Sequence, residues 1–378
     1  MSGLIVAEWI EAVGGAERVV DRFAGLFPDA DILCLWNDAP GRHRGRKVRE
    51  TWLARTPLRH HKALALPLMP LAWRRPAHGS PDWALVSSYA FAHHVQFTQP
   101  GTPTFVYAHT PARYLWAPEL DGRGDNLAAR IAGPPLRALD RRTAARATAV
   151  AANSRFVAQR VQRAWGVEAT VINPPVDVSY ISSGAWRDQL TDRERRRLDA
   201  LPRDFVLGVS RFIPYKRLDL VIAAGEALGM PVVIAGSGPL EGELRERGRT
   251  ARVPVHLQVA PSDAMLFALM ERAGLFVFPP VEDFGIVAVE AMAAGTPVIA
   301  NRVGGASESI REGVGGALFD PRSRSDLVAA ATRAVALPTE EVVRHAQQFD
   351  GPRFDENLTT WMARHGAPVT PPVVAQAL

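Results

Sequence analysis

The sequence of 378 residues is 47% hydrophobic and 22% charged, which excludes an intrinsically disordered chain and favours two globular domains. It contains one cysteine, Cys34, so a framework of disulfide bonds is excluded. No run of about 18 uncharged apolar residues is present, which argues against a membrane-spanning helix. The first residues do not resemble a signal peptide. We therefore expect a cytoplasmic protein.

Positive charge is concentrated in the first half of the chain. Residues 1–172 contain 22 Lys and Arg against 14 Asp and Glu, a net charge of +8, whereas the remainder has a net charge of −3. Arginines on solvated helix faces explain such an excess, and so does contact with an anionic membrane surface or a phosphorylated acceptor. The segment 58–75, LRHHKALALPLMPLAWRR, mixes basic and apolar residues and is the candidate for peripheral contact with the inner face of the plasma membrane. No nucleic-acid module accompanies the charge, so nucleic acid is not expected as a partner.

Short apolar runs recur along the chain, each followed by a turn and a helical pattern. Most lack the alternation of half-buried strands, so they predict parallel strands covered by helices on both faces. In the first half the predicted strands are 4–7, 31–35, 84–87, 104–108, 148–152 and 170–172. In the second half they are 205–209, 232–235, 255–258, 275–278 and 297–300. Two such series predict an α/β protein with two doubly wound, Rossmann-like domains.

A proline-rich stretch at 173–184, NPPVDVSYISSG, separates the two series. We therefore assign the N-terminal domain to residues 1–172, a linker and surface helix to 173–200, and the second domain to 201–350. Residues 351–378 are expected to form a C-terminal helix that crosses back, followed by a loose tail.

Glycine or polar residues follow five of the predicted strands. Ligands of open parallel sheets bind at the carboxyl ends of the strands, so these residues predict one shared cleft. They are Gly14 and Gly15, His109, Arg211 and Lys216, Glu282, and Asn301 with Gly304 and Gly305. Two cations spaced like Arg211 and Lys216 could bind a diphosphate, although taken alone a solvated basic turn explains the same pair.

The segment PPVEDFGIVAVEAMAAGTPVIA predicts a buried helix over 284–294, ended by Gly295. Glu290 lies in the middle of this apolar helix, where its carboxylate needs either an ion-pair partner or a ligand. Glu282 precedes the helix by a rise of about 12 Å, too far for the two carboxylates to act together on one bond. They suit instead the two ends of one long ligand, with a diphosphate at the helix N-terminus between them.

Residues 210–301 resemble the retaining GT-B glycosyltransferases of the GT4 family. The resemblance rests on the Glu-x7-Glu motif from Glu282 to Glu290, on the basic pair, and on GGASE at 304–308. In the first half, GGAERVV, LPLMPLAW, ALVSSYAFA and YAHTPARYLW resemble O-antigen and polysaccharide mannosyltransferases. Two features depart from that subgroup. The pair His93–His94 stands where a Lys-Gly pair is usual, and the opening strand lacks a VHDW-type run.

The resemblance implies a GT-B fold with two domains facing a cleft, and it implies roles in the second domain. Arg211 and Lys216 would neutralise the departing diphosphate. Glu282 would hold hydroxyls of the donor sugar, and Glu290 would bind the ribose. Three backbone amides would assist Glu282, those of Phe284, Gly285 and Ile286.

Roles in the first domain follow from the same resemblance. Gly14 and Gly15 would let the backbone approach the donor phosphates, and His109 would face the donor sugar. Three residues would lie nearer the acceptor, namely Arg113, Tyr114 and Trp116.

The expected function is retaining transfer of a hexose from a nucleotide sugar to a glycan or glycolipid in cell-surface polysaccharide synthesis, with mannose from GDP-mannose as first choice. No cofactor or metal is expected, because Asp29–Ala30–Asp31 precedes a strand and the histidines lack zinc-ligand spacing. One alternative is a UDP- or dTDP-sugar transferase acting on another acceptor such as a natural product. The others are a GT-B-shaped sugar-nucleotide epimerase or hydrolase, and a non-catalytic sugar-nucleotide-binding protein.

Overall fold

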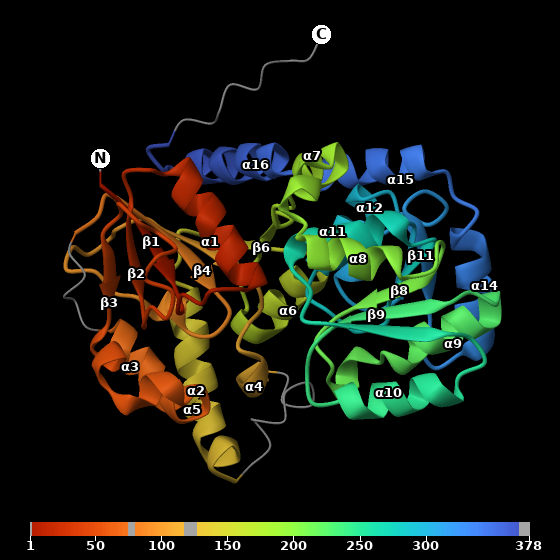
Figure 1. The fold of residues 1–378 in the computed structure, drawn as a ribbon. Helices are drawn as coiled ribbons and strands as arrows, with labels where there is room; N and C mark the ends of the chain where they lie inside the picture. Colours follow the sequence, from red (N-terminus) through yellow and green to blue (C-terminus); the bar gives the residue numbers. More distant parts are fainter. Residues whose placement is uncertain (1, 75–79, 117–126, 370–378) are drawn as a thin grey trace. The chain divides into compact units, whose positions relative to one another are not determined.

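The computed structural model describes residues 2–74, 80–116 and 127–369, without the side chains of 127–132 (Figure 1). The chain divides into two compact units. Unit 1 comprises Met1–Pro175 and Pro352–Leu378, and unit 2 comprises Val176–Gly351. Residues 370–378 of the expected loose tail lie outside the described residues. Among the helices that are described, none combines the length and the apolar character needed to cross a bilayer.

Unit 1 is built on a seven-stranded sheet in the order β3-β2-β1-β4-β5-β6-β7, and its strands all pair in parallel. The strands are β1 (Gly3–Ala7), β2 (Asp31–Cys34), β3 (Val48–Glu50), β4 (Trp83–Ser88), β5 (Thr104–Ala108), β6 (Ala149–Ala152) and β7 (Thr170–Val171). The direction of the strand order reverses between β1 and β4. In doubly wound folds this reversal marks the place where ligands bind.

Helices cover both faces of this sheet, because alternate strand residues point to opposite sides. Leu4 and Val6 pack on one face, whereas Ile5 and Ala7 pack on the other. The helices are α1 (Gly15–Leu26), η1 (Trp52–Arg55), η2 (Pro57–His60), α2 (Lys62–Ala65), η3 (Leu66–Leu68), α3 (Met69–Trp73), η4 (Ala92–His94), α4 (Arg113–Trp116), α5 (Leu127–Ala144), α6 (Arg155–Trp165) and α16 (Gly351–Arg364).

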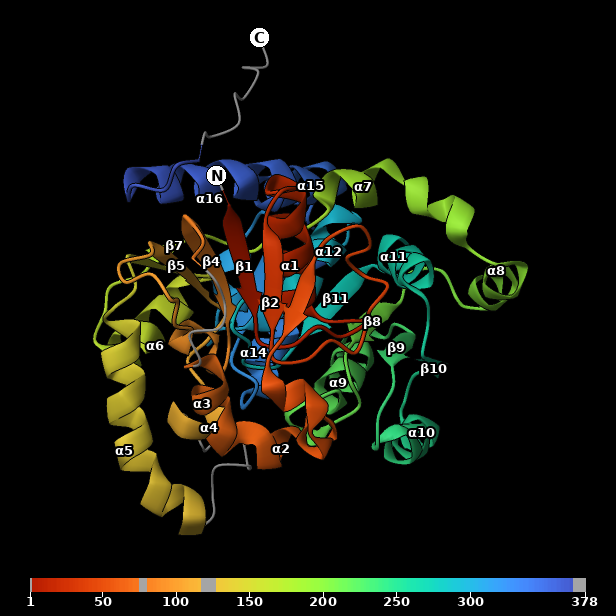
Figure 2. The ribbon, with the colours of Figure 1, turned by 90° about the vertical axis from the view of Figure 1, so that its left-hand side faces the viewer.

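The last helix, α16, packs on α1 in unit 1, as Figures 1 and 2 show. The rings of Phe23 and Phe354 stack with centroids 6.1 Å apart. The Arg22 guanidinium donates to the Asp355 carboxylate, with Nε 2.6 Å from Oδ1. Leu358 is fully buried in the same core. Unit 1 is therefore completed by the C-terminal end of the chain.

Unit 2 is built on a six-stranded parallel sheet in the order β10-β9-β8-β11-β12-β13. Its strands are β8 (Val206–Val209), β9 (Val232–Gly236), β10 (Val255–Val259), β11 (Leu275–Phe278), β12 (Val298–Asn301) and β13 (Gly316–Phe319). Its helices are α7 (Val178–Ser183), η7 (Ala185–Gln189), α8 (Asp192–Asp199), η8 (Pro214–Lys216), α9 (Asp219–Leu228), α10 (Glu241–Thr250), α11 (Asp263–Arg272), α12 (Ile286–Ala293), α13 (Ala306–Ser309), α14 (Arg324–Ala334), α15 (Thr339–Ala346) and η9 (Gln347–Phe349). Figure 1 shows α9 and α10 on one side of the sheet and α11 and α12 on the other. The strand order reverses between β8 and β11.

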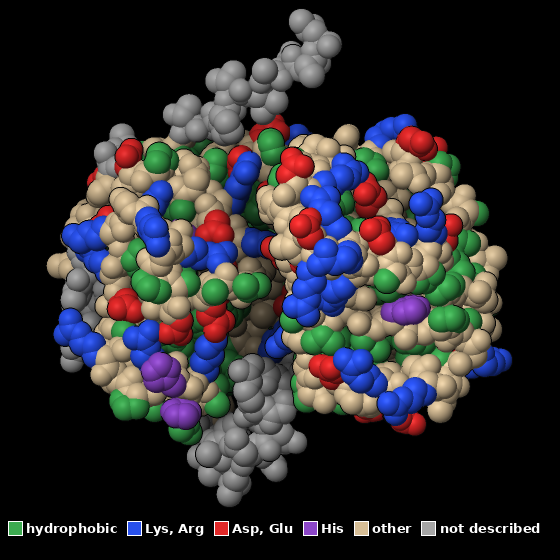
Figure 3. Space-filling view, in the orientation of Figure 1, with side chains coloured by type: hydrophobic (Ala, Val, Ile, Leu, Met, Phe, Trp, Pro, Cys, Tyr) green, Lys and Arg blue, Asp and Glu red, His purple; other side chains and the backbone are tan. Residues whose placement is uncertain are grey.

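The charged segment after the proline-rich stretch forms α8. Thr191 and Glu194 cap its first turn reciprocally, each side chain accepting from the backbone N–H of the other. The helix carries a run of arginines with exposed members, Arg193, Arg195 and Arg196. Figure 3 shows Lys and Arg side chains interspersed with Asp and Glu on this face of unit 2. The charges thus form a mixed, solvated surface and not a single basic patch.

The predicted α/β class with two doubly wound parallel sheets is confirmed, and each predicted strand is present. Two strands at the edges of their sheets, β3 and β13, were not predicted from the sequence. The helix predicted over 284–294 begins instead at Ile286, because Gly285 has a φ of 86° and is left-handed. It ends at Ala293, and Gly295 follows with a φ of 95°.

Candidate active site

Lys216 and Glu282 meet at the carboxyl edge of the unit 2 sheet. Lys216 follows β8 and Glu282 follows β11, the two neighbouring strands between which the strand order reverses. Lys216 Nζ donates to Glu282 Oε1, and the two side chains are 12% and 19% exposed. A partly buried ion pair thus occupies the place where this topology binds ligands.

Arg211 lies in the same loop as Lys216, and Tyr215 connects the two cations. The exposed Arg211 guanidinium lies 3.4 Å from the Tyr215 hydroxyl, and Lys216 Nζ lies 5.0 Å from the centroid of the Tyr215 ring. The structure therefore gathers both predicted basic residues around one tyrosine. Tyr215 was not among the site residues predicted from the sequence.

Two glycines after β9 set the position of the Arg211 loop. Gly236 and Gly238 have φ values of 141° and 153°, which only glycine adopts easily. A Cβ on Gly236 would lie 1.8 Å from the Ser210 carbonyl oxygen. The Phe212 amide donates to the Ser237 carbonyl over 2.8 Å. The run GSGP at 236–239 therefore allows the loop after β9 to pack closely on the Arg211 loop. The two glycines of this run were the sequence signal for that close packing.

The loop that carries Glu282 rests on the glycines after β12. The Gly305 amide donates to the Glu282 carbonyl over 2.7 Å, and a Cβ on Gly305 would lie 1.9 Å from the Asp283 carbonyl oxygen. Asn301 Nδ2 donates to the Pro279 carbonyl over 2.9 Å. Asn301, Gly304 and Gly305 thus hold the backbone of the Glu282 loop.

The helix α12 presents its first amides directly after Glu282. Gly285 caps its N-terminus without a side-chain hydrogen bond, and the backbone of Phe284, Gly285 and Ile286 forms this end. The first N–H groups of a helix have no partner within the helix and attract anions. Glu290 lies further along the same helix and is only 7% exposed.

In unit 1, His109 directly follows β5 and is tied to β4 and to Asn153. Its Nε2 lies 2.8 Å from the Ser87 hydroxyl oxygen. Its amide donates to the Ser88 carbonyl over 2.9 Å, and its carbonyl accepts from Asn153 Nδ2 over 3.1 Å. The His109 ring, which is half-buried, packs edge-on against Tyr107 and Tyr89.

The glycine pair at the start of α1 lies against a buried carboxylate. Gly14 has an extended backbone with a φ of 169°, which any residue can adopt. A Cβ there would instead lie 1.9 Å from the Glu17 carboxylate oxygen. Glu17 is 6% exposed, and burial raises the pKa of its carboxyl. The carboxylate of Glu17 therefore lies against Gly14 at the beginning of α1, where the donor phosphates were predicted to approach the backbone of Gly14 and Gly15.

The three residues expected near the acceptor lie in α4. Trp116 turns its indole N–H inward and donates to Asp140 Oδ2 over 2.7 Å. Tyr114 packs edge-on against Phe91 at 5.9 Å, and Arg113 is half-buried. Trp116 thus anchors α4 to α5 and does not point its indole nitrogen outward.

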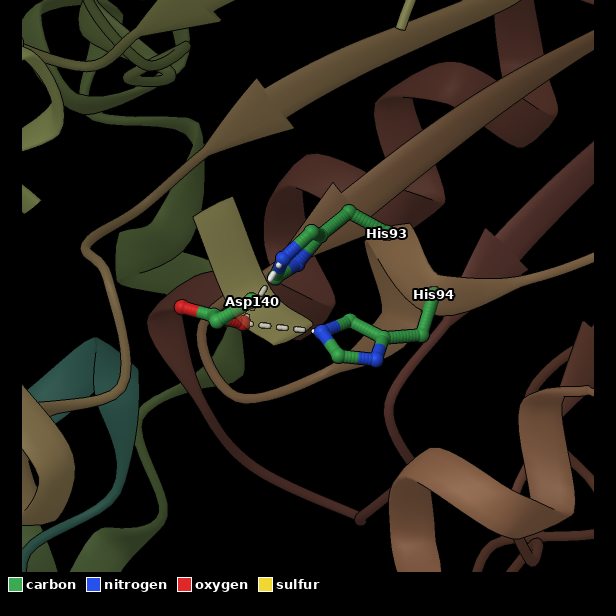
Figure 4. A group of neighbouring side chains, drawn as sticks. All are labelled: His93, His94 and Asp140. Carbon is green, nitrogen blue, oxygen red and sulfur yellow. Dashed lines mark hydrogen bonds and ion pairs between the residues drawn. The ribbon is translucent and has the colours of Figure 1, made fainter. Parts of the chain in front are cut away.

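Asp140 is the centre of a buried polar cluster that the sequence analysis did not predict (Figure 4). His94 Nε2 and His93 Nε2 lie 2.8 and 3.0 Å from Asp140 Oδ1. Trp165 Nε1 joins Trp116 in donating to Oδ2, over 2.7 Å. Burial alone would raise the pKa of Asp140, but the two histidines hold it well below its ordinary value.

The spacing within this cluster suits hydrogen bonds better than a metal ion. His93, His94 and Asp140 are close enough to be considered as metal ligands. Ligand atoms around a tetrahedral zinc ion at 2.0–2.1 Å are separated by about 3.3 Å. The N–O distances of 2.8 and 3.0 Å are shorter and typical of hydrogen bonds. Asp140 is therefore an anion that accepts hydrogen bonds from His94, Trp116 and Trp165, and His93 Nε2 lies beside it at 3.0 Å.

Glu8 is a second buried carboxylate, directly after β1. It is fully buried, and its Oε1 accepts from the amides of Tyr89, Ala90 and Ala92 over 3.3, 2.8 and 2.7 Å. It thereby joins the end of β1 to the loop after β4, where the strand order of unit 1 reverses. Glu8 was not predicted as a site residue, although a carboxylate immediately after a fully apolar strand is visible in the sequence.

Two family models match the chain almost end to end. "Glycosyltransferase Family 4" matches residues 13–180, and "Glycosyl transferases group 1" matches residues 191–348. A D-inositol 3-phosphate glycosyltransferase of Thermomonospora curvata is 31% identical over 289 residues, which cover 70% of this chain and 62% of that protein. The protein of the same name from Mycolicibacterium smegmatis is 30% identical over 263 residues, 62% of this chain and 59% of that protein. This chain thus spans about six tenths of the length of these curated relatives.

Solved structures share the fold over nearly the whole chain. HepE of Anabaena in complex with UDP is 18% identical, with a TM-score of 0.70 over 96% of this chain and 100% of that chain. Sucrose-phosphate synthase of Thermosynechococcus elongatus is 18% identical, with a TM-score of 0.70 over 96% and 99%. Two doubly wound units with these neighbours define a GT-B fold. The chain belongs to the GT4 family of glycosyltransferases.

Proposed function

We propose that this chain is a retaining, metal-independent glycosyltransferase that moves a hexose from a nucleotide sugar to a hydroxyl group of an acceptor. The contact between Lys216 and Glu282 carries the proposal. It places a cation suited to a diphosphate beside a carboxylate suited to sugar hydroxyls, at the reversal of strand order in unit 2.

Charge separation explains why these groups would accelerate the reaction. When the bond between the sugar and the phosphate breaks, positive charge develops on the sugar and negative charge on the phosphate. Arg211 and Lys216 would stabilise the negative charge, with the amides at the beginning of α12 adding to their effect. Fixed cations can supply this stabilisation, which is why a metal ion is not required.

Retention would follow from attack on the same face of the sugar. Glu282 is engaged by Lys216, which suits a carboxylate that binds hydroxyls and not one that attacks carbon. The acceptor oxygen would bond to the anomeric carbon as the bond to the phosphate breaks, and the acceptor proton would pass to the leaving phosphate oxygen. Glu290 would bind the ribose of the donor.

The donor and acceptor are proposed from the resemblance and from the relatives. GDP-mannose is the first choice, with a glycan or glycolipid of cell-surface polysaccharide synthesis as acceptor. UDP-glucose is the alternative donor, since one solved structure of HepE is a complex with UDP-glucose. Because the relatives are named for D-inositol 3-phosphate, a phosphorylated polyol is the alternative acceptor.

A donor screen tests the proposal. GDP-, UDP- and dTDP-linked mannose and glucose are compared for protection against thermal unfolding, because a ligand that binds the folded state raises its stability. The best donor is then assayed with glycan and phosphopolyol acceptors in excess EDTA, and the anomeric configuration of the product is determined by NMR. We expect transfer with retention.

Three outcomes would contradict parts of the proposal. Consumption of donor without an acceptor would favour the epimerase or hydrolase. Binding without turnover would favour a sugar-nucleotide-binding protein. A strict requirement for Mg²⁺ or Mn²⁺ would exclude the metal-independent mechanism.

A further inference from the structure

The loop after β8 presents an exposed tyrosine beside the basic pair of unit 2. Pro214 begins the short helix η8, and the Arg217 amide closes its turn by donating to the Pro214 carbonyl over 3.1 Å. Tyr215 lies within this turn and is 45% exposed. Its ring belongs to neither hydrophobic core of unit 2. The side chain therefore contributes little to the packing of the fold, although it is large and apolar.

Tyr215 offers a different group to each of the two cations. Arg211 Nη2 donates to the Tyr215 hydroxyl oxygen over 3.4 Å. Lys216 Nζ lies over the face of the ring, 5.0 Å from its centroid. The face of an aromatic ring attracts an ammonium ion within about 6 Å. Two groups of like charge, which repel each other, are therefore both attracted to one side chain.

The contacts of the Lys216 ammonium limit the direction from which an anion can bind it. An ammonium group has three N–H donors and no acceptor. Glu282 Oε1 accepts a hydrogen bond from Nζ, and the Tyr215 ring occupies a second side. Within the part of the chain that the structure describes, these are the side-chain contacts of Nζ. One N–H group thus remains for a ligand, and the carboxylate and the ring together set its direction.

We propose that Tyr215 is a positioning residue that holds Arg211 and Lys216 in the arrangement that binds a diphosphate. This inference rests on the proposed function and names the residue that orders its two cations. Long basic side chains lose conformational freedom when a ligand fixes them, and contacts that exist before binding reduce this loss. Tyr215 therefore acts through the two cations and not by contact with the ligand.

Inorganic pyrophosphate is the probe, because it carries the diphosphate without a base or a sugar. Calorimetric titration in excess EDTA compares the wild-type protein with two variants. Tyr215→Phe keeps the ring and should weaken binding about threefold, whereas Tyr215→Leu loses both contacts and should weaken it about tenfold. Tyr180→Leu is the matched control, since it alters another exposed tyrosine of unit 2, whose hydroxyl accepts from Gln189 over 2.7 Å. It should bind pyrophosphate like the wild-type protein.

A double-mutant cycle separates positioning from direct contact with the ligand. If the hydroxyl acts through Arg211, Tyr215→Phe should change the affinity by less than about 1.5-fold in an Arg211→Ala background. The further loss from Phe to Leu at position 215 should likewise disappear in a Lys216→Ala background. An undiminished effect of both Tyr215 variants in these backgrounds would show direct contact with the ligand and would refute the positioning role.

The contact between the ring and the ammonium can also be measured in the ligand-free protein. The ring current of Tyr215 should shift the proton NMR signal of the Lys216 Cε methylene upfield, because Cε adjoins Nζ. This signal is assigned by its loss in Lys216→Ala. We expect the upfield shift in the wild-type protein and in Tyr215→Phe, and its absence in Tyr215→Leu. An unshifted signal in the wild-type protein would overturn the proposal.

Transfer assays distinguish a failure of this proposal from a failure of the proposed function. With a productive donor, kcat/KM should fall in the same order, less in Tyr215→Phe than in Tyr215→Leu. Pyrophosphate binding that depends on Tyr215, in a protein that transfers no sugar, would overturn the proposed function and support the positioning role. Equal affinities of the wild-type protein and Tyr215→Leu would refute the positioning role alone. A wild-type protein that binds neither pyrophosphate nor a nucleoside diphosphate would overturn both.

Discussion

At the scale of single residues, the ion pair between Lys216 and Glu282 competes with the proposed binding of a diphosphate by Lys216. In the ligand-free protein each group neutralises the other, and both are largely shielded from solvent. A diphosphate must therefore share Lys216 with a carboxylate. In the proposed roles, the full donor would avoid this competition, because its sugar would offer hydroxyls to Glu282 while its diphosphate would bind Lys216. The pair would then favour binding of the intact donor over binding of the product nucleotide.

This competition predicts the behaviour of Glu282→Gln. We expect kcat to fall by roughly two orders of magnitude, since a charge contact in the transition state is lost. The affinity for free nucleoside diphosphate should rise by about fivefold, because an ion pair worth about 1 kcal/mol no longer competes. Glu290→Gln is the control, and it should weaken nucleotide binding. Calorimetric titration that finds equal losses of affinity in both variants would contradict the proposed division between sugar and ribose.

Alanine substitutions can also compare the cations of the loop that follows β8. Arg211→Ala and Lys216→Ala should each lower turnover at least about a hundredfold without unfolding the protein. Arg217→Ala removes a neighbouring cation that is bound to Asp219 over 2.9 Å, and it should leave turnover nearly unchanged. Equal rates in all three variants would remove the diphosphate role of the basic pair.

The buried cluster around Asp140 predicts a dependence of stability on pH. Burial lowers the pKa of His94 to about 4, with smaller effects of His93 and Arg74 in the same direction and an opposing effect of the bond to Asp140. Unfolded histidine titrates near 6.5, so between pH ~6.5 and ~4 the unfolded chain binds a proton that the folded protein does not. The stabilisation is thus present above pH ~6.5 and is lost as the pH falls towards 4.

We expect His94 to contribute a loss on the order of 3 kcal/mol across this range. Urea denaturation at pH 7 and pH 4.5 measures the loss, which should be clearly smaller in His94→Gln. His61→Gln alters an exposed histidine and should keep the wild-type dependence. Equal dependence in the wild-type protein and His94→Gln would show that His94 is not the responsible group.

At the scale of secondary structure, the continuous apolar run of a central strand was the most readily predicted pattern. Central strands such as β5 and β11 are continuous apolar runs, and their observed bounds equal the predicted ones. The edge strand β3, with the sequence VRE, is only half-buried, so its pattern does not differ from that of a loop. The start of α12 was predicted too early, because propensity does not reveal that Gly285 is left-handed.

The site residues that could be predicted from the sequence were also those next to apolar strands. Arg211, Lys216, Glu282 and His109 could be selected because each lies shortly after an apolar strand in the sequence. Asp140 could not, because its partners lie more than twenty positions away and its position in α5 looks like any polar helix residue. Sequence order does not show which distant groups share one buried carboxylate.

The exposed apolar and basic side chains between η2 and α3 predict an interaction with lipid. Met69 and Trp73 face inward, whereas Leu64 and Leu71 are 67% and 52% exposed. Figure 3 shows histidine and hydrophobic side chains exposed together over α2. Lys62 is bound to Glu11 over 2.6 Å, so the basic charge free to contact lipid is smaller than the sequence suggests, and Arg75 lies outside the described residues.

We therefore expect weak binding to anionic vesicles that salt diminishes, since each basic residue contributes about 1 kcal/mol. Leu64→Gln and Leu71→Gln should weaken sedimentation with phosphatidylserine vesicles at low salt. Val335→Gln, which alters an exposed apolar residue of unit 2, should not. If the wild-type protein does not sediment at low salt, the basic excess is a solvated surface.

At the scale of the whole molecule, unit 1 is made from two separate parts of the chain and unit 2 from one. The fully buried Leu358 lies in the core that α16 shares with α1. Leu358→Ala should destabilise unit 1 by about 2–5 kcal/mol, the usual cost of such a cavity. Leu327→Ala makes the equivalent change in the core of unit 2. Hydrogen exchange should report each loss only in the strands of the altered unit, and equal effects of Leu358→Ala on both sheets would contradict this division.

Because unit 1 is made from two separate parts of the chain, synthesis determines the order in which the two units complete their folding. Chains emerge from the ribosome at about 5–20 residues per second, and domains generally fold as units. The residues of unit 2 are complete once Gly351 has emerged, whereas unit 1 still lacks Phe354, Leu358 and Trp361. Until these residues emerge, the apolar face of α1 that receives them stays open to solvent or to a chaperone. Unit 1, whose first residues precede unit 2 in the sequence, is therefore the unit that finishes folding last.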